Sequence, residues 1–141
     1  MKLPNKHPRL PQRKTGLLLV NLGTPDSTNW WDIRKYLKEF LSDKRVIEVN
    51  PILWQLILNL FILTFRPAKT AKAYQKIWMK KQNMSPLRYF TIKQTSNLQK
   101  RMKNSVLEID YAMRYGNPSI EKKLSQLKEK GCQEMIILPL Y

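Results

Sequence analysis

The 141-residue sequence predicts a single α/β domain built on a parallel sheet. A short, continuous apolar run over residues 15–21 precedes a Gly-Thr-Pro turn, as expected for a strand that is buried on both faces. Residues 106–138 read in turn as a strand, a helix and a second apolar strand, which is the length of one β-α-β unit. The chain between these segments has apolar residues at helical spacing, so we expect helices to dominate the middle.

The first strand is expected over residues 15–21, and a helix should follow it. Apolar residues recur at helical spacing from Ile33 to Leu41, and Asn29 with Asp32 three positions later can cap the start of this helix. In the middle of the chain, similar spacing predicts three further helices, over residues 51–65, 68–78 and 87–103.

The last third of the chain alternates between strand and helix signals. Residues 106–113 alternate as a strand, and Asn117 and Pro118 can supply the N-cap and first position of a helix. An apolar stripe follows, and Gly131 should end this helix. Residues 135–138 are continuously apolar and predict a second buried strand.

Loops at the carboxyl ends of parallel strands are the expected ligand sites of such a sheet. Three segments qualify, over residues 21–26, 114–118 and 139–141, and Arg114 adds a cation that could pair with a carboxylate or a phosphate. An ordinary strand-to-helix turn is the alternative interpretation of each. The loop at Gly23 has neither the dinucleotide-binding glycine pattern nor a P-loop, so phosphate binding is not indicated there.

The net charge of +16 is concentrated in two segments. Residues 1–14 carry five Lys or Arg and three Pro, which predicts a solvated basic arm, and residues 49–107 carry eleven Lys or Arg without any Asp or Glu. The second segment begins with the apolar residues 51–65, too short for a helix that spans a bilayer. Residues 51–65 are predicted to form either a buried core helix or an apolar lip that contacts a membrane or a large apolar ligand. A nucleic-acid-binding module lacks the expected stacking platforms and motifs.

Several classes of chemistry are excluded by the residues present. His7 and Cys132 are the only His and Cys, so no disulfide framework, zinc cage or Ser-His-Asp set can be assembled within the chain. We therefore assign no catalytic and no metal-ligating residue. The basic arm lacks the apolar centre of a secretory signal, and a cytoplasmic location is expected, with peripheral membrane contact through residues 51–65.

Seven segments resemble the ferrochelatase family, in family order and at near-family spacing. They cover residues 15–141 of the chain, and they occupy residues 16–26, 36–46, 66–67, 74–78, 85–87, 112–119 and 138–141. The resemblance implies a chelatase-like, three-layer fold with a parallel sheet. In the family two similar α/β halves hold a porphyrin between them, and this chain corresponds to the N-terminal half, incomplete at its C-terminus.

The resemblance also implies the family's activity, which is the insertion of ferrous iron into protoporphyrin IX during haem biosynthesis. The family's catalytic His and Glu have no counterpart among the 141 residues, so we expect the isolated chain to be inactive. It would need no cofactor of its own, and a second chain would have to supply the missing half. A porphyrin- or haem-binding protein without catalysis is the alternative. No nucleic-acid partner is expected.

Porphyrin-binding residues are implied by positions that match the family. Arg66 would pair with a propionate, Tyr74 would pack on the ring, and Ser85 would donate a hydroxyl hydrogen bond. Each residue also has an alternative without a ligand. Arg66 would be a solvated cation at the start of a helix, Tyr74 a core residue and Ser85 an ordinary turn residue. Three more residues match the pocket wall and the end of the second strand: Leu22, Arg114 and Tyr115.

Overall fold

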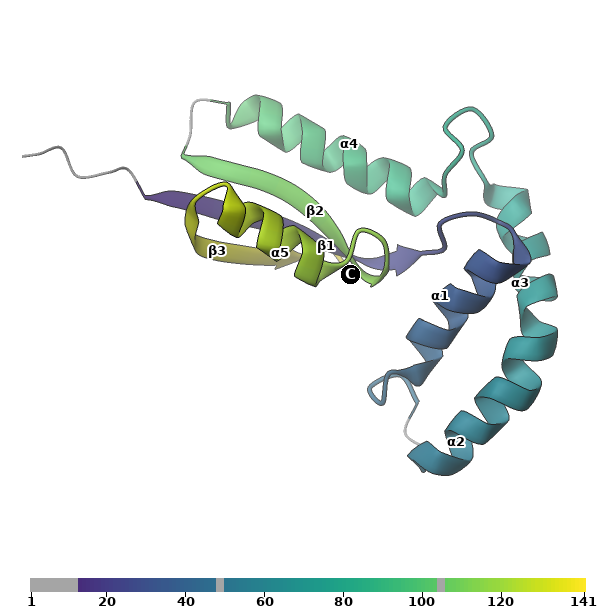
Figure 1. Ribbon diagram of the computed structural model, residues 1–141. Coiled ribbons are helices and arrows are strands. Elements are labelled where there is room, and N and C mark those ends of the chain that lie inside the picture. Colours follow the sequence, from purple (N-terminus) through teal and green to yellow (C-terminus); the bar gives the residue numbers. More distant parts are fainter. Residues whose placement is uncertain (1–12, 48–49, 104–105) are drawn as a thin grey trace, which may run out of the picture.

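A computed structural model describes residues 13–47, 50–103 and 106–141 (Figure 1). Three parallel strands form one sheet in the order β2-β1-β3, with β1 spanning Lys14–Thr24, β2 Leu107–Gly116 and β3 Cys132–Pro139. The predicted α/β fold with a parallel sheet is therefore confirmed. The predicted arm over residues 1–14 lies outside the described residues except for its last two positions, the second of which begins β1.

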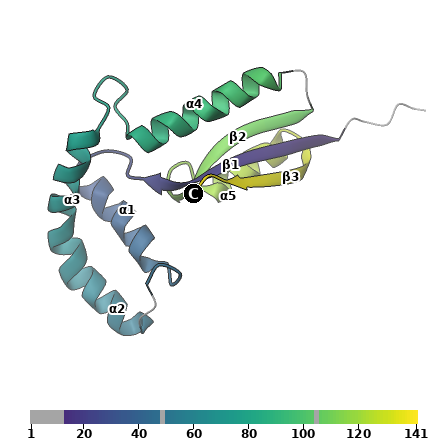
Figure 2. The same cartoon turned by 180° about the vertical axis from the view of Figure 1, so that it is seen from behind.

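Within the described residues, five α-helices and one π-helix connect and cover the strands. They are α1 (Trp30–Ser42), α2 (Pro51–Ile57), the π-helix η1 (Leu58–Ile62), α3 (Leu63–Ile77), α4 (Pro86–Arg101) and α5 (Ile120–Glu129). Helices α4 and α5 cover opposite faces of the sheet, as Figures 1 and 2 show from two sides. Successive side chains of a strand point to opposite faces of the sheet. On β1 the side chain of Asn21 donates a hydrogen bond to Thr91 of α4, whereas Leu18, on the other face, packs with Leu127 of α5. This arrangement gives the three layers expected for the domain.

Two separate clusters of buried side chains form the interior of the described residues. One lies between the sheet and α5 and contains Leu18, Val20, Ala112, Leu127 and Cys132. The other lies among the helices beyond the carboxyl end of the sheet and contains Ile33, Leu37, Leu41, Leu58, Leu63 and Ala71. Figure 1 shows the second group, α1 with α2 and α3, projecting from the sheet as a helical arm.

The helix ends agree with the predicted signals in two of three cases. The side chain of Asn29 accepts from the backbone N–H of Asp32 at 2.8 Å, and Gly131 lies just after α5 with φ +85°, both as predicted. The predicted N-cap at Asn117 is wrong, because Ser119 caps α5 by accepting from the N–H of Lys122. The side chain of Asn117 instead donates across the loops.

The two helices predicted over residues 51–65 and 68–78 are one continuous helical run from Pro51 to Ile77. Pro67 lies between the two predicted helices, and a proline inside a helix leaves the carbonyl four residues earlier without its N–H donor. That carbonyl belongs to the fully buried Leu63, and it accepts instead from Nε of Arg34 at 3.2 Å. A side chain of α1 thus replaces the missing backbone donor, and the helix continues through Pro67.

Strand β3 differs from its prediction in burial. Residues 135–138 were predicted to form a buried strand because they are continuously apolar. They do lie in β3, but β3 is an edge strand, and Met135, Ile136, Ile137 and Leu138 are 36%, 52%, 51% and 45% exposed. The prediction of a buried strand here is therefore wrong for the described residues, since nothing in this structure covers the outer edge of β3.

Candidate porphyrin site

The three predicted site loops meet at the carboxyl edge of the sheet. Thr24 at the end of β1 pairs with Gly116 at the end of β2, and β3 reaches the same edge. A hydrogen-bond network ties the first two loops together, because Arg88 of α4 donates to Asp26 at 2.7 Å and to the carbonyl of Asn117 at 3.0 Å. Asn117 also donates to Asp26 at 2.6 Å. The strand ends are therefore fixed relative to one another before any ligand arrives.

An open, mostly apolar hollow of about 720 Å³ runs along α3 at the side of the helical arm. Rings from Phe61, Phe65 and Tyr74 line it, and Arg66 and Lys69 add two cations. Its volume falls within the range of small-molecule pockets. Two of the predicted porphyrin-binding residues, Arg66 and Tyr74, thus lie in one hollow.

A row of aromatic rings leads from this hollow to the end of β2. The ring of Tyr74 meets that of Tyr36 edge to face at 6.4 Å between centroids, and Tyr36 stacks on Phe40 at 6.1 Å. Phe40 in turn meets Tyr115 edge to face at 5.1 Å. Such ring pairs favour fixed relative orientations. The structure therefore links the predicted residues Tyr74 and Tyr115 through two rings of α1.

Arg114 and Tyr115 share one acceptor, the carboxylate of Asp43 at the end of α1. The guanidinium donates to Oδ2 of Asp43 at 2.6 Å, and the hydroxyl of Tyr115 donates to the same atom at 2.9 Å. The backbone N–H of Arg45 and then the Tyr115 hydroxyl hold the pKa of Asp43 below its ordinary value. This ion pair joins α1 to β2, and the predicted contact of Arg114 with a ligand stays a prediction.

Tyr36 is the residue that joins the aromatic row to the first strand. Its hydroxyl donates to the carbonyl of Gly23 at 3.3 Å, and the residue is only 9% exposed. Burial, followed by the proximity of Tyr74, raises the pKa of Tyr36. It therefore stays a neutral hydrogen-bond donor throughout the physiological pH range.

The remaining two predicted residues lie nearer the sheet. Leu22 is half-buried on β1, next to Gly23, whose carbonyl Tyr36 contacts. Ser85 is 2% exposed, and its hydroxyl oxygen accepts from the backbone N–H of Arg88 at 3.2 Å, which caps α4. The geometry thus gives Ser85 a structural role, and its contact with a porphyrin stays a prediction.

Several residues of the site were not predicted from the sequence. The hollow is lined by two rows of residues spaced four apart. One row contains Phe61, Phe65, Lys69 and Ala73, and the other contains Ile62, Arg66, Thr70 and Tyr74. This spacing was a usable signal for one helix face, but splitting the helix near residue 67 concealed it. The pairing with Asp43 had no sequence signal, since it joins residues 71 positions apart.

No resident metal site is indicated in the described part of the chain. Within residues 13–47, 50–103 and 106–141, no three His, Cys, Asp or Glu side chains are grouped so as to hold a metal ion. Acidic side chains near the sheet edge are instead engaged by cations or amides, as Asp26 is by Arg88 and Asn117. What the site offers to a ligand is therefore aromatic surface and positive charge.

Comparison with known sequences identifies the family of this chain. The sequence model of the family described as Ferrochelatase matches residues 14–141. The chain belongs to the ferrochelatase family. The match covers all three strands and all the helices of the described structure, so the hollow and the carboxyl edge both lie within the ferrochelatase region.

Curated ferrochelatases of Francisella tularensis are similar to this chain. Identity is 53% over 128 residues to the protein of subspecies holarctica strain FTNF002-00 / FTA, and 52% to those of subspecies tularensis strain WY96-3418 and subspecies novicida strain U112. Each alignment covers 91% of this chain but only 38% of the relative. The chain thus spans well under half the length of the ferrochelatases it matches.

Proposed function

We propose that this chain is the porphyrin-binding part of a ferrochelatase that inserts ferrous iron into protoporphyrin IX in haem biosynthesis. The observation that supports the proposal most directly is the hollow on α3, where three aromatic rings lie beside Arg66 and Lys69. Protoporphyrin is a flat apolar ring with two carboxylates, so it needs both kinds of group in one place. Membership of the ferrochelatase family supports the choice of ligand.

The hollow suggests a role for each residue. The rings of Phe61 and Phe65 are 61% and 72% exposed, so a bound macrocycle would remove apolar surface from water. Tyr74 would pack against the edge of the macrocycle, held there by Tyr36. Arg66 would pair with one propionate, and Lys69, one turn further along α3, would attract the other. We also propose that four further residues contact the porphyrin: Leu22, Ser85, Arg114 and Tyr115.

Iron insertion itself requires a base that removes the two pyrrole protons as the metal enters. The only His of the chain, His7, lies outside the described residues. We therefore propose that the isolated chain binds porphyrin without metallating it, and that residues from the rest of a ferrochelatase complete the reaction. Ferrous iron is a substrate in this proposal, and the chain needs no cofactor.

A titration with protoporphyrin IX tests the binding site. We expect saturable quenching of tryptophan fluorescence with a matching Soret shift, and about three- to tenfold weaker binding for Arg66→Ala, as one charge-assisted contact predicts. Lys72→Ala is the matched control, since Lys72 is an exposed cation of the same helix that does not line the hollow. Linear uptake without saturation, or equal losses in the two variants, would contradict the proposed site.

A ferrous or zinc insertion assay separates the enzyme from the alternative of a porphyrin or haem carrier. Alone, the chain should show no metallation above a blank without protein. A ferrochelatase part should metallate once the rest of a ferrochelatase is supplied, whereas a carrier would bind porphyrin in both conditions and turn over in neither. Turnover by the chain alone that depends on Arg66 would refute the proposed division of labour.

We further propose that the helical arm rests on an anionic membrane, which would place the protein in the cytoplasm at the membrane surface. The run Pro51–Ile77 is long and apolar enough to cross a membrane by length and composition. Its inner side packs on α1 through Leu58 and Leu63, however, which favours lying on the surface. On its outer side the exposed Ile52 and Leu56 border a second apolar hollow of about 730 Å³.

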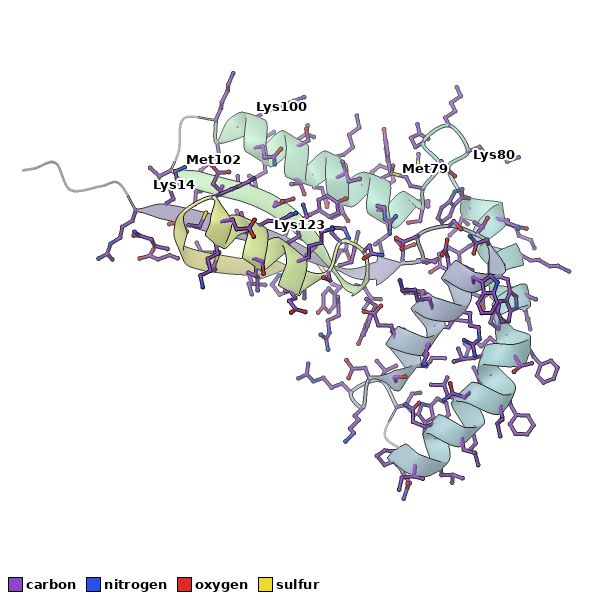
Figure 3. All side chains as sticks on the ribbon, in the orientation of Figure 1. Lys14, Met79, Lys80, Lys100, Met102 and Lys123 are labelled. Atoms are coloured by element: carbon purple, nitrogen blue, oxygen red, sulfur yellow. The ribbon has the colours of Figure 1, made fainter. Side chains whose placement is uncertain are left out.

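Positive charge accompanies this apolar surface. Helix α3 carries cations along its length, and Lys80 projects from the loop that follows it, as Figure 3 shows. Figure 3 also shows ring side chains projecting outward from the arm. Cations next to exposed apolar side chains suit an anionic bilayer, to which each basic residue near the surface adds about 1 kcal/mol.

Flotation with vesicles tests the membrane contact. On vesicles that contain phosphatidylglycerol, we expect Leu56→Asp to lower the bound fraction about fivefold, because it removes apolar contact and adds repulsion. Phe90→Asp is the control, since Phe90 of α4 is 59% exposed and Leu56 is 58% exposed. Equal binding by the two variants, or equal binding to neutral vesicles, would count against a membrane-bound arm.

A further inference from the structure

A polar hollow lies between the starts of α4 and α5, beside strand β2. Its volume of about 540 Å³ is within the range of small-molecule sites. Three of its lining residues are cations, Arg88 of α4 with Lys122 and Lys123 of α5, and none of its described lining residues is acidic. This basic hollow shares no lining residue with the hollow on α3, so the two are separate places on the molecule.

Two of the three cations are held in place by the fold. Lys123, labelled in Figure 3, reaches from α5 to β2, where it donates to Asp110 at 2.8 Å and lies 5.9 Å from the ring centroid of Tyr111. Arg88 donates to Asp26 at 2.7 Å. The side chains of Lys123 and Arg88 are only 19% and 15% exposed. Because both are already ordered, a ligand that contacts them pays little for fixing their rotamers.

These side chains also keep hydrogen-bond donors that the fold does not use. An ammonium has three N–H donors and a guanidinium has five. Lys123 donates once, to Asp110, and both hydrogen bonds from the Arg88 side chain come from Nη2, while its Nε has no partner among the described residues. Within the described parts of the chain, the hydroxyl of Tyr111 and the ammonium of Lys122 form no hydrogen bond or ion pair. The basic hollow therefore has an excess of donors.

The neighbouring hollow has the opposite charge. It is smaller, at about 160 Å³, and it borders the basic hollow at Asn117, which lines both. Its charged lining residues are three acids and one base: Asp26, Asp32, Glu39 and Lys35. Charges of the two signs are thus separated at this end of the sheet, and the side with Arg88 is the one that favours an anion.

We propose that the basic hollow binds the phosphate group of a small, soluble phosphate ester between Arg88, Lys122 and Lys123. A phosphate ester carries a charge of about −1.5 to −2 at pH 7 and three strong acceptor oxygens, which match three cations with unused donors. The phosphate group alone would fill only part of the hollow, and the Tyr111 ring and Pro118 offer apolar surface to the organic part of the ester. This inference goes beyond the proposed function, because it does not depend on porphyrin binding.

A titration of the full 141-residue chain with glycerol 3-phosphate, followed by the backbone amide signals in nuclear magnetic resonance, tests the site. We expect saturable shifts with a dissociation constant below about 1 mM. The largest shifts should be at Lys122, Lys123 and Gln126, which line the hollow on α5. Glycerol without the phosphate should produce no saturable shift at these residues.

Substitutions identify the groups that hold the phosphate. Lys122→Met should weaken binding about three- to tenfold, because it removes one charge-assisted contact. Tyr111→Phe removes only the hydroxyl and keeps the ring below Lys123, so it should weaken binding about two- to fivefold. Lys128→Met is the control, since Lys128 is an exposed cation of α5 that does not line the hollow. Lys122 is exposed as well, so the circular dichroism of both lysine variants should match that of the unmodified chain.

Several outcomes would overturn the inference. Equal losses for Lys122→Met and Lys128→Met would show only a general attraction of anions to a basic surface. Saturable shifts with dihexanoyl phosphatidic acid but not with glycerol 3-phosphate would assign the hollow to a lipid headgroup. Displacement of bound protoporphyrin by glycerol 3-phosphate would place the anion in the hollow on α3 instead. A chain that binds glycerol 3-phosphate at α5 but does not bind porphyrin would support this inference and refute the proposed function.

Discussion

The contact between Arg34 and the carbonyl of Leu63 allows a decisive test of how helix α3 tolerates Pro67. Arg34→Met removes the guanidinium donor but keeps an apolar side chain of similar length. In a chain with Pro67, the carbonyl of Leu63 then loses its side-chain donor, and the residue four positions later has no N–H to replace it. Pro67→Ala restores a backbone N–H four residues after Leu63, so Arg34→Met should cost much less in that background.

The expected magnitudes follow from the contacts of Arg34. A buried carbonyl left without a partner costs about 1–3 kcal/mol. The guanidinium also lies 5.7 Å from the Trp30 ring centroid and 6.0 Å from that of Trp31, contacts worth about 0.5–1 kcal/mol each at exposed sites. The tryptophan contacts are lost in both backgrounds and cancel in a double-mutant cycle. The coupling between Arg34 and Pro67 should therefore be about 1–2 kcal/mol.

Urea unfolding of the four proteins of the cycle, followed by far-ultraviolet circular dichroism, measures this coupling. The same set includes the original chain, both single variants and the double variant. The result expected is a free energy of unfolding that falls more for Arg34→Met with Pro67 present than with Ala in its place. An equal loss in the two backgrounds would show that the guanidinium does not replace the missing helical donor.

Two further predictions concern residues at the strand ends. Gly23→Ala should lower the unfolding free energy by more than about 4 kcal/mol, because Gly23 has φ +120° and a Cβ there would lie 1.9 Å from the carbonyl oxygen of Tyr115. Gly131→Ala should cost only about 1–2 kcal/mol, because Gly131 has φ +85° but a Cβ there would have nothing within 4 Å. Similar losses for the two variants in urea unfolding would contradict this prediction. Because hydrogen bonds lower the pKa of Asp43, its contribution to stability is present above the ordinary value of 3.8 and is lost as pH falls below it. Asp43→Asn should therefore lower the urea midpoint at pH 7 and differ progressively less from the original chain below pH 3.8, and a difference that grows in acid would exclude this reasoning.

The regular parts of the fold were predictable because their signals are local. The apolar run of β1, the cap at Asn29 and the stop at Gly131 each depend on residues within a few positions. The continuous helix from Pro51 to Ile77 was not predictable, because the donor that compensates for Pro67 comes from Arg34, on a different helix. A single sequence does not show which distant side chain will arrive at a given carbonyl.

The candidate site divides in the same way. Arg66 and Tyr74 were named from their family positions, and the structure places both in one hollow. Asp43 was missed because its pairing with Arg114 and Tyr115 is determined by how α1 packs against the end of β2. The apolar run of β3 predicted a buried strand, whereas the resemblance to half of a family fold implied that the strand ending at Tyr141 would be uncovered, and the structure agrees with the second expectation.

The separation of the interior into two clusters affects how far the effect of a substitution extends. The helical arm holds its own buried residues, such as Leu58 and Leu63, and the sheet holds another set with Leu18 and Leu127. Between them lie ring edges and a few hydrogen bonds, including that from Tyr36 to Gly23. Because the two interiors are separate, a substitution that loosens one of them should leave the packing of the other unchanged.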